Sequence, residues 1–206
     1  MPALLAPLEE ARENLRVIRQ TMERSTKYST LSGLSGVLIG LSAIISVVVT
    51  SRLLHARADA HQSAQGIYPQ LSLLWLVELM LAVGIEFAWN KRRARHIGKW
   101  VASPLGAHII VAALPAFVGA LALTAFFALH GMAALVWGIW MLTYGLAICA
   151  VGLFSVRPVS YLGAAFVLAG AITLLLPTQW QLFMMGLTFG GFHIVYGALM
   201  GRKHGW

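Results

Sequence analysis

The chain has 206 residues, of which 59% are hydrophobic and only 11% are charged. A soluble domain of this size is excluded, because charged residues make up about a quarter of an ordinary soluble domain. The composition predicts instead a polytopic membrane protein.

Six apolar runs are long enough to cross the roughly 30 Å hydrocarbon core of a bilayer as α-helices. They cover approximately residues 31–50, 71–89, 105–129, 132–154, 159–176 and 182–200. The runs lack the strict alternation of an outer-membrane barrel, so helices are the conformation that satisfies their backbone hydrogen bonds. The sequence predicts an all-α fold, in which residues 28–206 form a six-helix transmembrane domain.

The N-terminal segment, residues 1–27, has no continuous apolar run, and this excludes a cleaved signal peptide. Its apolar residues recur at helical spacing between charged ones: Leu8, Ala11, Leu15, Ile18 and Met22. The pattern predicts a cytoplasmic amphipathic helix. Four acids against five bases leave the segment nearly neutral. We therefore expect its apolar face to dock under the bundle or against a second copy, rather than on anionic lipid.

The basic residues predict how the bundle is oriented. With both termini on one side, thirteen of the fifteen Lys and Arg residues fall on that side, and only Arg52 and Arg57 fall on the other. Cytoplasmic loops of membrane proteins carry such an excess of positive charge. We expect both termini to be cytoplasmic, in a membrane of the bacterial inner-membrane type. The net charge of +8 is thereby explained without a nucleic-acid partner.

The densest basic cluster follows the second span and consists of Lys91, Arg92, Arg93, Arg95 and Lys99. Such a loop attracts anionic lipid headgroups by about 1 kcal/mol for each basic residue close to the surface. Its expected role is to set the topology, and a specific contact with membrane lipids or a partner is the alternative.

Two acids, Glu78 and Glu86, lie on one face of the helix expected for the second span. Glu86 stands one turn from the basic cluster, where interfacial water or a cation can reach it. Glu78 lies near mid-depth, where an ionised acid costs on the order of a few kcal/mol unless it is paired, protonated or hydrated. No Lys or Arg lies in any predicted span. Glu78 therefore needs water, a ligand or a histidine to offset its desolvation.

Small residues mark the first and sixth spans as closely packed helices. Ser32, Gly36 and Gly40 recur at intervals of four, which favours packing inside the chain, with a dimerisation motif as the alternative. In the sixth span His193 shares a face with three glycines: Gly186, Gly190 and Gly197. One interpretation makes His193 a neutral interface residue bonded to a carbonyl or hydroxyl group. The other pairs it with Glu78, since His193 lies in depth between the two acids.

These residues point to a ligand-binding or proton-relay site, for which the candidates are Glu78, His193, Trp75, Trp140, Tyr144, Tyr196 and Glu86. Two classes of function fit them. The first is a membrane protein that binds or conducts a small polar, cationic or amphiphilic ligand, linked to proton transfer, in an intramembrane cavity. The second is a non-catalytic membrane subunit or regulatory scaffold. Its cytoplasmic helix and basic loop would contact a partner, in a homo-oligomer or a larger membrane complex.

Other kinds of site lack their sequence signals. Cys149 is the single cysteine, and no phosphate-binding glycine loop, His-Glu-x-x-His motif or Gly-x-Ser-x-Gly elbow occurs. His193 is the only histidine well inside a span, so a bis-histidine haem is not supported. We expect no metal and no cofactor. An enzyme is the weaker expectation, because a lone Glu–His pair does not determine a reaction.

Overall fold

The computed structural model describes residues 13–15, 33–61, 64–96 and 104–204. Over these residues seven α-helices and no strand are present: α2 (Gly33–Asp59), α3 (Tyr68–His96), α4 (Pro104–Leu129), α5 (Val136–Gly152), α6 (Arg157–Leu175), α7 (Thr178–Met185) and α8 (His193–His204). Two short 3-10 helices, η2 (Ala64–Ile67) and η3 (Ala133–Leu135), precede α3 and α5. A π-helical stretch, η4 (Gly186–Phe192), joins α7 to α8 in one continuous helix.

Six helices in this part of the chain are long and apolar enough to cross a membrane. The prediction of an all-helical chain with six such helices is confirmed. The first helix extends beyond the apolar run at residues 31–50, because α2 continues to Asp59, and η2 follows. An apolar run measures only the stretch suited to hydrocarbon, whereas a helix can continue beyond it where water solvates its polar side chains.

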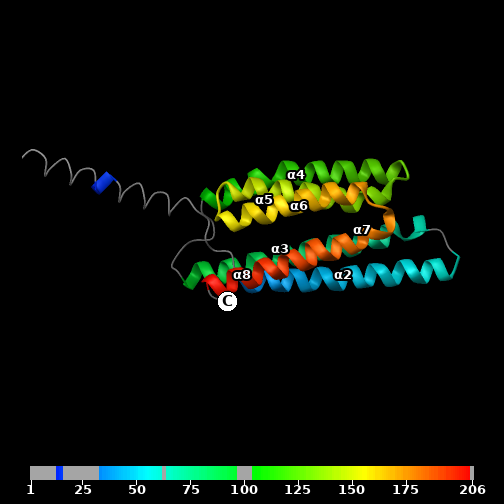
Figure 1. Cartoon of the computed structure of the whole chain (residues 1–206), viewed down its shortest axis with the longest axis horizontal. Helices are drawn as coiled ribbons and strands as arrows, with labels where there is room; N and C mark the ends of the chain where they lie inside the picture. Colours follow the sequence, from blue (N-terminus) through cyan, green and yellow to red (C-terminus); the bar gives the residue numbers. More distant parts are fainter. Residues whose placement is uncertain (1–12, 16–32, 62–63, 97–103, 205–206) are drawn as a thin grey trace, which may run out of the picture.

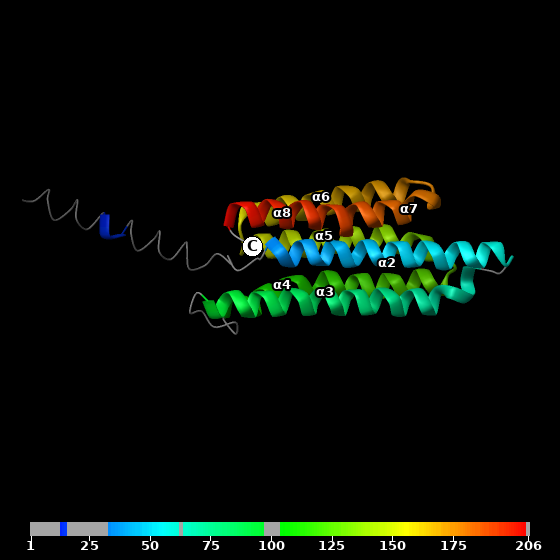
Figure 2. The ribbon, with the colours of Figure 1, turned by 90° about the horizontal axis from the view of Figure 1, so that it is seen from below.

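The helices form two layers of three (Figures 1 and 2). In one layer α2 lies between α3 and α8, and in the other α5 lies between α4 and α6. The helix formed by α7, η4 and α8 begins beside α5 and α6 and ends beside α2. Residues from this helix therefore reach both layers.

Glycines allow the close packing inside each layer. Gly33, Gly36 and Gly40 of α2 face Gly190, Gly197 and Gly201 of the last helix, and a Cβ on Gly40 would lie 2.6 Å from the carbonyl oxygen of Gly190. This confirms that Gly36 and Gly40 pack inside the chain. In α5 and α6 the glycines recur every seven residues: Gly138, Gly145 and Gly152, then Gly163 and Gly170. Such a repeat keeps one seam facing the neighbouring helix at a small crossing angle.

An apolar core joins the two layers. Met141 of α5, Phe166 of α6 and Met185 of α7 are buried at its centre. Trp75 and Val47 pack against this cluster from the other layer. The indole rings of Trp75 and Trp137 meet edge to face, with centroids 5.6 Å apart. Aromatic pairs in this arrangement are attractive beyond the area they bury.

The turn between α4 and α5 follows a glycine-capped helix end. Gly131 has φ +72°, and the Met132 N–H donates to the Phe127 carbonyl at 2.8 Å while the Gly131 N–H donates to Ala128 at 3.4 Å. These two bonds form a Schellman motif, which a left-handed residue makes possible. Helices α4 and α5, joined by this short turn, form an antiparallel hairpin and pack side by side.

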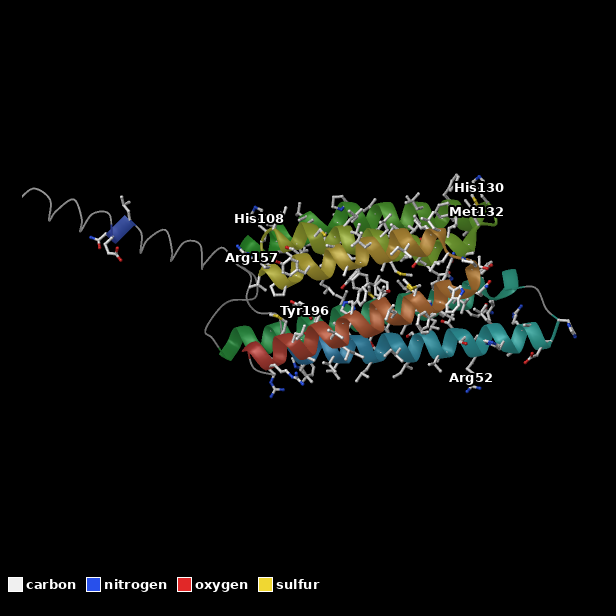
Figure 3. All side chains as sticks on the ribbon, viewed as in Figure 1. Arg52, His108, His130, Met132, Arg157 and Tyr196 are labelled. Carbon is white, nitrogen blue, oxygen red and sulfur yellow. The ribbon has the colours of Figure 1, made fainter. Side chains whose placement is uncertain are left out.

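Basic side chains lie at both ends of the bundle, but unequally. Lys91, Arg92, Arg157 and Arg202 are exposed at the end where α3 and α8 finish, here called the basic end. Arg52 lies toward the opposite end, whereas Arg157 lies at the basic end (Figure 3). Lys99 and the side chains of Arg93 and Arg95 fall outside the described residues.

Of the predicted N-terminal helix, the structure describes only Glu13, Asn14 and Leu15. These three residues are helical, and the Leu15 side chain is 66% exposed. The expected burial of Leu15 under the bundle is therefore not seen within one chain. The rest of this predicted helix lies outside the described residues.

Candidate functional site

Glu78 lies in the interface between α2 and α3, midway along the span Tyr68–Trp89, and is only 8% exposed. Its two carboxyl oxygens are held by two serines of α2. The Ser42 hydroxyl lies 2.7 Å from Oε1, and the Ser46 hydroxyl lies 3.0 Å from Oε2. Ser42 and Ser46 are one helical turn apart, so both side chains point from the same face of α2. We call these two residues the serine pair.

The Ser42 hydroxyl has a second acceptor within reach, the Ile39 carbonyl at 2.9 Å. A hydroxyl group carries one hydrogen and can also accept. If Glu78 is ionised, Ser42 donates to Oε1. If Glu78 is protonated, its O–H donates to Ser42, and Ser42 donates to Ile39. The same positions of the heavy atoms thus provide hydrogen bonds for both protonation states of Glu78.

The polar face of α2 continues one turn beyond the serine pair. Thr50 is fully buried, and its hydroxyl donates to the Ser46 carbonyl at 2.8 Å and accepts from Trp75 Nε1 at 3.2 Å. Trp75 is three residues before Glu78 on α3. The hydroxyl groups of α2, spaced four residues apart, therefore bond two residues of α3. The serine pair bonds Glu78, and Thr50 bonds Trp75. The sequence carried this signal, because Ser42, Ser46 and Thr50 share a helical face.

His193 lies in a second polar cluster between the layers and is 6% exposed. Its Nδ1 lies 2.9 Å from the Phe189 carbonyl, and its Nε2 lies 2.8 Å from the Tyr144 hydroxyl of α5. A carbonyl can only accept, so Nδ1 carries the proton. With the ring neutral, Nε2 is then the acceptor and the Tyr144 hydroxyl donates to it.

The π-helical stretch positions His193. In an α-helix the His193 N–H would donate to the Phe189 carbonyl, but here it donates to Gly190. The Phe189 carbonyl accepts a hydrogen bond from the imidazole Nδ1–H instead. The rings of Phe166 and Phe189 surround the His193–Tyr144 pair, with centroids 4.8 to 6.2 Å from those of Tyr144 and His193. π-Helical turns inside α-helices occur frequently at functional sites.

The structure does not join Glu78 to His193. Both oxygens of Glu78 are bonded to α2, and both ring nitrogens of His193 are bonded to Phe189 and Tyr144. Their positions within the predicted spans put the two residues at similar depths in the membrane. The rotation of each helix about its axis, however, directs their side chains to different neighbours. The interpretation of His193 as a residue bonded to a carbonyl and a hydroxyl agrees with these contacts.

The other predicted site residues divide between the layers. Trp140 packs against α4, since its Nε1 donates to Thr124 at 3.0 Å and its ring centroid lies 6.5 Å from that of Phe117. Glu86 of α3 lies within electrostatic range of Tyr144 and of Tyr196, and the two tyrosines interact in the same way. Tyr144 and His193 are in direct contact through the hydrogen bond between them.

No group of three or more His, Cys, Asp or Glu residues that could hold a metal ion occurs within the described ranges. The chain matches no family model, no curated protein and no solved structure. The chemistry of the two polar clusters is therefore the basis for any functional assignment.

Proposed function

We propose that this chain is an integral membrane protein that binds or conducts a small polar or cationic ligand, linked to protonation of Glu78. In this proposal its six helices cross a membrane of the bacterial inner-membrane type, with both termini cytoplasmic. The unequal basic ends support this orientation, because positive charge gathers on the cytoplasmic side.

The observation that carries the proposal is the alternative hydrogen bonding of Ser42. A purely structural acid needs partners for one protonation state only. Glu78 has partners for both, because Ser42 lies within hydrogen-bond distance of Oε1 and of the Ile39 carbonyl. Ionisable residues inside membrane spans commonly belong to proton relays or to ion and substrate pathways. A carboxyl group that gains and loses a proton can exchange it for another cation.

Infrared difference spectroscopy on the full-length protein in liposomes tests the proposal. We expect a carboxylic acid C=O band to appear or disappear when the pH of the buffer is changed. Glu78→Gln should abolish this band, because the amide keeps the shape of the side chain without a titratable proton. Glu86→Gln is the matched control on the same helix and should retain the band. Identical difference spectra for wild type and Glu78→Gln would show that Glu78 does not exchange protons.

A membrane subunit or scaffold is the second candidate, and two observations favour it. All the hydrogen-bonding atoms of Glu78 and His193 have partners inside the chain, as structural polar residues do. Leu15, on the apolar face of the predicted N-terminal helix, is exposed and accessible to a partner. In this case Glu78→Gln should leave activity and complex formation unchanged, whereas Leu15→Ser should weaken the complex.

A further inference from the structure

The carboxyl group of Glu78 has hydrogen-bond partners but no countercharge on the two helices that hold it. Its oxygens are bonded to the hydroxyls of the serine pair, at 2.7 and 3.0 Å. The facing stretches of α2 and α3, residues 33–51 and 68–90, contain no Lys or Arg. His193 does not supply the charge, because both of its ring nitrogens are bonded elsewhere. An ionised Glu78 therefore needs a positive partner that these helices do not provide, since an unpaired charge at mid-membrane is unfavourable.

The oxygen atoms around Glu78 form a donor set for a hard cation. Two of them are the carboxyl oxygens of Glu78, and two are the hydroxyl oxygens of Ser42 and Ser46, each within hydrogen-bond distance of a carboxyl oxygen. Hard cations such as Ca²⁺ and Mg²⁺ bind to oxygen ligands. Glu78 is 8% exposed and Ser46 is 5% exposed, so the donor set lies inside the protein.

The hydrogen of Ser42 can turn away from a cation without losing its acceptor. The Ile39 carbonyl lies 2.9 Å from the Ser42 hydroxyl, so the O–H can donate to Ile39. The lone pairs of the Ser42 oxygen then face the carboxylate and can bind a positive ion beside it. The ion takes the place of the proton of Glu78, and the net charge of the group is zero in both states.

We propose that Glu78, Ser42 and Ser46 form a sodium site, in which Na⁺ and a proton compete for the carboxyl group. A single carboxylate balances one positive charge, which favours a monovalent ion over Ca²⁺ or Mg²⁺. The hydroxyl and carboxyl oxygens lie 2.7 and 3.0 Å apart. This close spacing favours Na⁺ over the larger K⁺, because Na⁺ is similar in size to Ca²⁺, which binds oxygen at about 2.3–2.6 Å. The inference deepens the proposed function by naming the cation, and it rests on that function because the proton must leave Glu78 for the surrounding water when Na⁺ binds.

Infrared titration of the full-length protein in liposomes tests the competition. The carboxylic acid band that Glu78→Gln removes is followed against pH, in NaCl and in choline chloride of equal ionic strength. Because one Na⁺ displaces one proton, the midpoint pH of the band should fall by about one pH unit for each tenfold rise in Na⁺ once the ion binds. KCl should have a much weaker effect. Equal midpoints in NaCl and choline chloride would overturn the sodium site and leave the proposed protonation of Glu78 intact.

Serine variants test the donor set. Ser42→Ala and Ser46→Ala each remove one hydroxyl ligand, and each should raise the Na⁺ concentration needed for a given shift by about tenfold or more. The band itself should still titrate with pH in both variants. Ser51→Ala is the matched control on the same helix, because Ser51 contacts His55 and not Glu78. Wild-type responses to Na⁺ in Ser42→Ala and Ser46→Ala would contradict the proposed site.

Thermal unfolding decides the case in which no band of Glu78 titrates, a result that by itself contradicts the proposed function. Na⁺ should then raise the Tm of the wild-type protein above its value in choline chloride, because an ion that binds only the folded state stabilises it. It should not raise the Tm of Glu78→Gln, which has no carboxylate. A wild-type Tm that is the same in both salts would overturn the sodium site as well.

Discussion

Glu78 keeps both carboxyl oxygens bonded although it lies among apolar helices. The serine pair supplies these bonds from a single face of α2. Burying a carboxyl group without partners is unfavourable, so the serine pair explains how the acid is retained at mid-span. Both serines bond Glu78, but they are not equivalent. The Ser42 hydroxyl also lies within hydrogen-bond distance of the Ile39 carbonyl, whereas Ser46 donates to Glu78 Oε2.

Ser46→Ala should therefore destabilise the protein more than an ordinary serine substitution does. It removes the donor to Oε2, and we expect the free energy of unfolding to fall by about 1–2 kcal/mol. Ser51→Ala is the control. Ser51 lies on the same helix, but its hydroxyl makes only a long hydrogen bond, of 3.4 Å, to the exposed His55. Chemical unfolding in detergent measures both variants. Equal stabilities would mean that Glu78 does not depend on Ser46.

The sequence predicted that Glu78 needs water, a ligand or a histidine as a partner, and in the structure the serine pair bonds both of its carboxyl oxygens. Glu78 was singled out because burying an ionised acid near the middle of a span is unfavourable, and this argument requires only the depth of the residue. The partner of Glu78 depends on how each helix is rotated about its axis. Side-chain packing determines this rotation, and the depth of a residue does not reveal it. The spacing of Ser42, Ser46 and Thr50 was the signal that could have identified α2 as the facing helix.

At the scale of the helices, glycine positions decide how closely neighbours approach. A Cβ on Gly145 would lie 2.6 Å from the backbone nitrogen of Val167 and 2.8 Å from the Gly163 carbonyl oxygen. A Cβ on Gly119 of α4 would meet nothing within 4 Å. A side chain at Gly145 would therefore clash with the neighbouring helix, whereas a side chain at Gly119 in the adjacent helix would not.

Gly145→Ala should accordingly destabilise the bundle, while Gly119→Ala should not. The added methyl group must push α6 away, and we expect a loss of about 1–3 kcal/mol in unfolding free energy. Gly119→Ala should instead raise stability by up to about 1 kcal/mol, because alanine is the better helix former. Thermal melting of both variants gives the comparison. A Gly145→Ala protein as stable as Gly119→Ala would contradict the close α5–α6 contact.

The apolar runs predicted where the spans lie, but not how the helices end or deform. Helix α2 runs nine residues past the predicted end at Thr50, to Asp59. The π-helical stretch at Gly186–Phe192 had no counterpart in the sequence analysis, which read the sixth span as a single regular helix. A π-helical turn depends on competing hydrogen bonds, such as the one between His193 and Phe189, that become defined only when the helix is packed.

At the scale of the whole molecule, two layers of three helices meet through an aromatic and methionine core. The helices joined by short connections, α4 with α5 and α5 with α6, are in contact. The contact between the first and last helices was beyond sequence reasoning, because glycine stripes identify packed faces without naming their partners. Among the described residues, Lys91, Arg92, Arg157 and Arg202 are exposed at the basic end, and Arg52 lies toward the opposite end.

The central claim is that these six helices cross a membrane with the basic end in the cytoplasm, and cysteine labelling tests it most directly. In a Cys149→Ala background, single cysteines at Ala60 and Arg202 place one exposed reporter at each end of the bundle. In sealed right-side-out vesicles, an impermeant maleimide should label the cysteine at Ala60 immediately and the cysteine at Arg202 only after permeabilisation. Labelling of both from the same face of intact vesicles would contradict the account.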